Sequence, residues 1–184
     1  MELIGPYLAA CLLLVAAGTA KAFRPADTAR ALAATVPIRL SMLVPLVRVG
    51  AGAELLVGAA GLALPSPWTA WPVALSYLGF AAYVGVVLVR GGPLASCGCF
   101  ATPDVPVTRV HVALDLVLGA SAAVVAAAVP TQWLPALLSG QPWAGVPLGA
   151  TSLLGAWLAF LAMGRLAELG AARRRLGITR GPVG

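Results

Sequence analysis

The run Cys97-Gly98-Cys99 holds the residues of this chain best suited to chemistry. A single intervening residue lets two thiols close into a small disulfide ring, and Gly98 relieves the backbone strain of that ring. Strained and accessible disulfides are the ones that exchange readily with other thiols. The pair therefore predicts thiol–disulfide redox chemistry, with binding of a soft cation such as Cu(I) as the main alternative.

The composition around this pair is that of a membrane protein. Of 184 residues, 60% are hydrophobic and 10% are charged, whereas a soluble domain carries roughly a quarter charged residues. A chain this apolar needs the lipid bilayer as solvent, and its length suits one bundle of four or five spans. We therefore expect an all-α, polytopic membrane helical bundle in which residues 1–184 form a single integral membrane domain.

Five apolar stretches approach the roughly 20 residues that a helix needs to cross a bilayer. They cover residues 5–22, 49–64, 71–89, 110–129 and 147–163, and the second could begin nearer Leu40. The dithiol loop, 90–109, separates the third and fourth spans, and a basic tail, 164–184, follows the fifth. Residues 23–36 are less apolar and predict a short amphipathic surface helix entered through Pro25. Cys11, inside the first span, is expected to be a buried apolar residue.

The basic residues predict the orientation of the chain. All 12 lysines and arginines fall between the first two spans, between the third and fourth, or after the fifth. The remaining connections carry tryptophans instead, as expected of interfacial anchors. Because basic residues stay in the cytoplasm, we expect the N-terminus outside and the C-terminus and dithiol loop inside. No nucleic-acid partner is expected, because the charges do not gather with aromatic residues on one face.

Three further ionisable residues lie inside predicted spans. Glu54 comes six residues after Arg48, and Asp115 comes six residues after Arg109, so each carboxyl lies about 9 Å along its helix from a basic anchor. His111 precedes Asp115 by four residues and therefore shares its helical face. Ionisable groups inside a membrane usually face the bundle interior or a wet cavity.

The sequence thus predicts that thiols and proton carriers gather near the inner leaflet. The expected set is Cys97, Cys99, His111, Asp115 and Glu54. A nearby imidazolium or arginine would stabilise the thiolate, and the last three residues would relay protons. Structural alternatives stay open, with His111 as an ordinary helix-start residue and the carboxyls paired to Lys21 or Arg48. One histidine and three cysteines do not favour a closed zinc site, and no metal ligands are assigned.

The order of these features extends over about residues 5–130. A first span ends near Gly18-Thr19-Ala20-Lys21, a second carries Glu54, and Ser96-Cys97-Gly98-Cys99-Phe100 precedes His111. This order resembles the methylamine-utilisation family MauE, within the broader DoxX-like membrane proteins. The resemblance implies a four-helix DoxX-like core plus a fifth C-terminal span, as in the longer members.

The resemblance also implies a bacterial inner-membrane location and a thioredoxin-like partner that exchanges disulfides with Cys97 and Cys99. Two positions depart from the family pattern. Ala101 stands where members usually have glycine, and Leu114 stands where they often have arginine. The second departure weakens the case for a charge pair in the fourth span.

The charge pattern and the resemblance point to opposite sides of the membrane. The resemblance implies a role in maturing a disulfide-rich subunit of an amine dehydrogenase. Disulfide maturation of such an exported enzyme takes place outside the cytoplasm, whereas the basic residues place the dithiol inside. A cytoplasmic dithiol would exchange with thioredoxin-like proteins, or would pass electrons across the bilayer through a quinone or a second protein.

Three functions stay open: a thiol–disulfide oxidoreductase component, a Cu(I)-binding membrane module, and a non-catalytic subunit that assembles with other membrane subunits.

Overall fold

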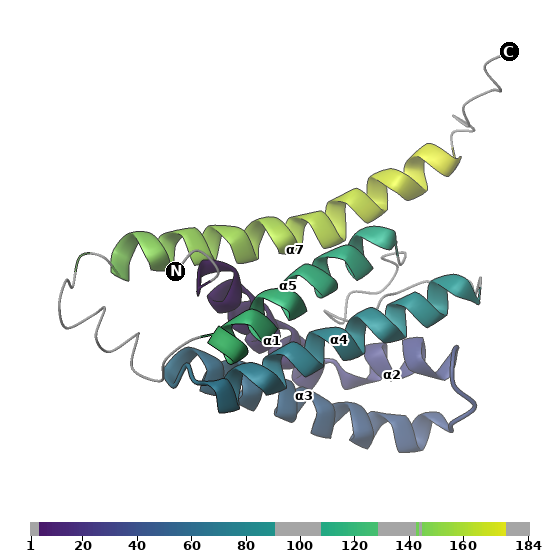
Figure 1. The fold of residues 1–184 in the computed structure, drawn as a ribbon. Helices are drawn as coiled ribbons and strands as arrows, with labels where there is room; N and C mark the ends of the chain where they lie inside the picture. Colours follow the sequence, from purple (N-terminus) through teal and green to yellow (C-terminus); the bar gives the residue numbers. More distant parts are fainter. Residues whose placement is uncertain (1–3, 91–107, 129–142, 144, 176–184) are drawn as a thin grey trace, which may run out of the picture.

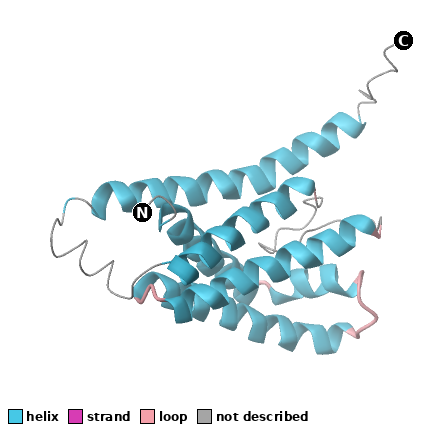
Figure 2. Ribbon diagram, in the orientation of Figure 1, coloured by secondary structure: helices cyan, strands magenta, loops and turns pink. Residues whose placement is uncertain are grey.

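The structure, a computed structural model, describes residues 4–90, 108–128, 143 and 145–175, with side chains up to residue 165. Across these ranges the chain is helical and contains no strand (Figure 2). The prediction of an all-α bundle is confirmed. The helices are α1 (Ile4–Phe23), α2 (Pro25–Ala33), α3 (Leu40–Ala63), α4 (Pro67–Val89), α5 (Arg109–Ala128) and α7 (Gly145–Arg175).

Five of these helices, all except α2, are long and apolar enough to cross a membrane. Helix α3 begins at Leu40, well before Val49, and it runs through Pro45 without ending. Helix α4 begins at Pro67 because Ser66 and Thr69 form a capping box, each side chain accepting the other's backbone N–H. Both helices are therefore longer at their N-terminal ends than the apolar pattern alone indicates.

Helix α1 is the centre of the bundle and packs against α3, α7 and α5, while α4 packs chiefly against α5. Glycines bring α1 and α3 close together. A Cβ at Gly18 would lie 2.7 Å from the Ala51 carbonyl oxygen, and one at Gly58 would lie 2.8 Å from the Cys11 carbonyl oxygen. Small residues allow such close backbone approach between membrane helices. Cys11 itself is free and buried, as expected.

The amphipathic segment after α1 forms the helix α2, as predicted, and it packs against the first half of α3. Ala29 is fully buried there in a small apolar cluster with Leu43 and Val47. The N-terminal extension of α3 is what provides this contact, because both apolar partners precede Val49 in the chain. Helix α2 therefore forms part of the wall of the bundle.

One end of the bundle carries several basic residues of the described helices. Figure 1 shows α2, the start of α3, the end of α4 and the start of α5 at the same end, on the right of the view. We call this the basic end, and it carries Arg30, Arg39, Arg90 and Arg109. The dithiol loop is attached there, since the described chain stops at Arg90 and resumes at Thr108.

Gly58→Ala is expected to destabilise the protein, because the added methyl would overlap the α1 backbone. Overpacking of this kind costs roughly 1–3 kcal/mol. Gly52→Ala on the same helix is the matched control, since nothing lies within 4 Å of its Cβ, and alanine favours the helix there. Thermal unfolding in mild detergent measures both variants, and equal melting temperatures would argue against the close α1–α3 contact.

Candidate functional site

A buried ion pair joins α1 to α3. The Lys21 Nζ lies 2.6 Å from Oε1 and 2.8 Å from Oε2 of Glu54, and Lys21 is only 5% exposed. Gly18, about one helical turn before Lys21, provides the close approach that makes this reach possible, because its Cα faces Ala51 and Glu54. Of the two basic partners considered for Glu54, the structure selects Lys21.

The same ammonium group contacts a third helix. The Lys21 Nζ lies 4.7 Å from the centroid of the Phe80 ring on α4. A cation over an aromatic face is attracted by the ring quadrupole, and the attraction strengthens when the cation is desolvated. Lys21 is therefore held by α3 and α4 together, although these two helices contact each other much less than either contacts its main partner.

His111 and Asp115 are both buried, at 1% and 3% exposure. They begin the buried stripe of α5 that continues through Leu118, Ala122 and Val125 at spacings of three and four residues. The shared helical face predicted for His111 and Asp115 is thus directed into the bundle. Neither residue lies at the lipid-facing surface of α5.

The His111 ring is oriented by the residue that precedes the helix. Its Nδ1 lies 3.3 Å from the Thr108 backbone nitrogen and 3.0 Å from the Thr108 hydroxyl oxygen. A backbone N–H can only donate, so Nδ1 accepts, and the neutral ring carries its proton on Nε2. The first turn of α5 therefore fixes both the position and the tautomer of this histidine.

Lys21 connects the two groups of polar residues. It lines a small space of about 20 Å³ together with Asp115, Tyr77 and Phe80. The Lys21 side chain thus contacts Glu54 and also lines the small space next to Asp115. Lys21 therefore lies close to both Glu54 and Asp115, while His111 lies one helical turn from Asp115 on the same buried face of α5.

The thiols of the predicted set, Cys97 and Cys99, lie outside the described residues. The structure gives only the attachment points of their loop, at the basic end. Within the described ranges, no group of three or more histidine, cysteine, aspartate or glutamate residues could hold a metal ion.

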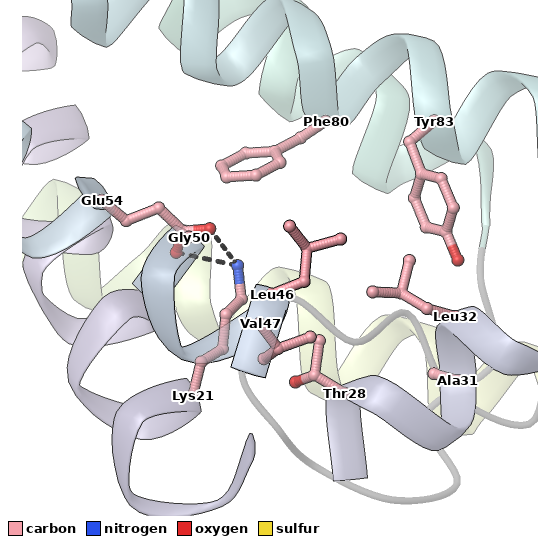
Figure 3. Close-up of a pocket in the computed structure, with 10 residues that line it drawn as sticks. All are labelled: Lys21, Thr28, Ala31, Leu32, Leu46, Val47, Gly50, Glu54, Phe80 and Tyr83. Carbon is pink, nitrogen blue, oxygen red and sulfur yellow. Dashed lines mark hydrogen bonds and ion pairs between the residues drawn. The ribbon is translucent and has the colours of Figure 1, made fainter. Parts of the chain in front are cut away.

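Sequence reasoning missed a cavity beside the ion pair, between α2, α3 and α4 (Figure 3). Its volume is about 220 Å³. Lys21 and Glu54 form one part of the wall, while Phe80 and Tyr83 of α4 form another. The sequence gives little indication that Phe80 and Tyr83 line a cavity, because aromatic residues in an apolar span are more often lipid-facing or core residues.

Fold and site together define a multi-pass helical membrane protein with an ion pair buried between its helices. The chain belongs to the MauE family, because the family described as methylamine utilisation protein MauE matches residues 2–130. The match covers α1 to α5, whereas α7 lies beyond it. No curated protein and no solved structure matches the chain.

Lys21→Met is expected to destabilise the protein by about 3–5 kcal/mol, because it leaves the Glu54 carboxylate buried without its partner. Glu54→Leu alone should cost a similar amount by stranding the ammonium group. The double variant, Lys21→Met with Glu54→Leu, should recover much of that loss. Chemical or thermal unfolding of the four proteins measures the coupling, and simple additivity of the two losses would contradict a direct pair.

Proposed function

We propose that this MauE-family protein is a thiol–disulfide redox component of the bacterial inner membrane. Cys97 and Cys99 cycle between disulfide and dithiol and exchange with a thioredoxin-like partner. A partner thiolate attacks one sulfur of the Cys97–Cys99 disulfide, and its second thiol resolves the mixed disulfide. Two electrons and two protons pass to the cysteine pair, while the partner becomes oxidised.

The observation that carries this proposal is the position of the loop attachments relative to the buried polar residues. The loop joins α4 and α5, which pack extensively against each other. Arg90 and Arg109 flank the loop and are exposed. Positive charge beside a thiol favours the thiolate, which is the form that attacks a disulfide. The two arginines therefore support an activated dithiol at the basic end.

The buried residues near that end support a role in proton transfer. His111 lies in the first turn of α5, directly after the loop, and Asp115 follows one turn deeper. Reduction of a disulfide takes up two protons, and His111 can relay one by taking up a proton at Nδ1 in place of the Thr108 hydrogen bond and releasing the proton on Nε2. Asp115, together with the Lys21–Glu54 pair, provides further ionisable groups along the same interior.

The redox state of the cysteines tests the proposal directly. Acid-quenched cells treated with an alkylating reagent should show two cysteines whose mass shift depends on prior reduction. The shift should disappear in Cys97→Ser and in Cys99→Ser, and it should remain in the control Cys11→Ala. Full alkylation of both residues under every redox condition of the cell would contradict the proposal. Metal that copurifies with protected thiols would favour the Cu(I) alternative.

Labelling from one side of the membrane tests the proposed orientation. A non-permeant maleimide should reach reduced Cys97 and Cys99 in inside-out vesicles and should fail to reach them in intact spheroplasts. The expectation follows from the basic residues at the same end of the bundle, which favour the cytoplasmic face. Labelling in spheroplasts alone would reverse the orientation and place the exchange outside the cytoplasm.

A further inference from the structure

The cavity beside the Lys21–Glu54 pair has the size of a single substituted ring. Its volume is about 220 Å³. An apolar protein cavity of about 150 Å³ binds benzene, whereas pockets for drug-sized ligands begin near 300 Å³. A six-membered ring with small substituents therefore fits inside it.

The chemistry of the wall favours an uncharged ligand. Most lining side chains are apolar, and they include Leu32, Leu46 and Val47. The one cation in the wall, Lys21, is already neutralised by Glu54 at hydrogen-bond distance. An ionic ligand would have to leave water without gaining a counter-charge, and this is strongly unfavourable.

Polar groups nevertheless stand at two separate places in the wall. The Lys21 ammonium group lies on one side, and the Tyr83 hydroxyl lies on the other, with Leu46 drawn between them in Figure 3. The Thr35 hydroxyl donates its proton to the Leu32 carbonyl oxygen, so Tyr83 donates to Thr35 across 3.2 Å, and the Tyr83 oxygen is left to accept from a ligand. A flat ring that accepts from Lys21 at one edge, that carries at the opposite edge an oxygen able to donate to Tyr83 once it is reduced to a hydroxyl, and that packs against Phe80 matches this arrangement.

The cavity is open on the side that faces lipid. Leu46 is 60% exposed, and nothing lies within 4 Å of a Cβ built on Gly50. Both residues line the cavity on α3, where that helix makes few contacts with α4. A ligand with an apolar tail would therefore enter from the bilayer and leave its tail in lipid.

We propose that this cavity binds the head group of a lipid-soluble quinone. The inference rests on the proposed function for its chemistry: the Cys97–Cys99 dithiol loses two electrons and two protons and becomes a disulfide, and the quinone gains both and becomes a quinol. The cavity lies toward the end of the bundle where the dithiol loop is attached. Tyr83 precedes Arg90 by seven residues, or about 10 Å along α4.

Quinone binding to the full-length protein in lipid nanodiscs tests the inference, with decylubiquinone as the probe. Leu46→Trp should fill the opening and weaken binding about tenfold or more. Leu56→Trp is the matched control, because Leu56 is a comparably exposed leucine, at 69%, on the same helix and outside the cavity lining. Tyr83→Phe should weaken binding of the reduced probe, decylubiquinol, since it removes an acceptor for the quinol hydroxyl and keeps the ring.

Three outcomes would overturn the inference. They are absence of saturable binding to folded wild-type protein, equal effects of the two tryptophan variants, and equal competition by decanol, which would indicate a pocket for lipid tails. Binding should persist in the Cys97→Ser, Cys99→Ser double variant. This result separates the two proposals. If alkylation shows that Cys97 and Cys99 never change redox state while quinone still binds, the redox function is refuted and the quinone site stands.

Discussion

A lysine inside an apolar helical bundle must find a counter-charge, and this requirement shapes the arrangement of the MauE-family protein. Lys21 is almost fully buried, and Glu54 of α3 supplies the partner at hydrogen-bond distance. A buried ion pair adds little net stability compared with apolar residues, but loss of one member is costly. The pair therefore acts mainly on specificity, since it favours the register of α1 and α3 that keeps both charges together.

The register has consequences on both sides of α1. Toward α3 and α4, it creates the cavity whose wall carries the ion pair and the aromatic residues of α4. Toward α5, it places Lys21 beside the space lined by Asp115, one turn below His111. Ionisable groups from three helices thus share one interior, close to the end where the dithiol loop begins. That arrangement suits a protein that moves electrons between thiols and a carrier in the bilayer, because such transfer also moves protons.

Much of the fold followed from local properties of the sequence. Apolar stretches of membrane length gave the number of long helices, and the spacing of His111 and Asp115 gave their common face. The start of α3 was harder to place, because Leu40–Arg48 contains both Pro45 and a charged residue and forms its helix against α2. Tertiary packing outweighs local propensity there.

The ion-pair partner of Glu54 could not be predicted from the spacing of residues along the sequence. Lys21 and Arg48 were both plausible, and the choice follows from the approach of α1 and α3 at Gly18, a contact between helices far apart in the chain. The cavity was missed for the same reason, since Phe80 and Tyr83 become neighbours of Lys21 only through the fold. The thiols were singled out by their residue type and spacing, and their role stays a prediction because they lie outside the described residues.

Infrared difference spectroscopy of the protein in lipid tests most directly whether the Lys21–Glu54 pair is charged. A spectrum of wild type minus Glu54→Gln, repeated with isotope-labelled glutamate, separates the ionised carboxylate from the protonated acid. The ion pair predicts that the substitution removes a carboxylate band and no protonated-carboxyl band. Loss of a protonated-carboxyl band instead would show a neutral Glu54 and would contradict the charged pair on which the bundle is built.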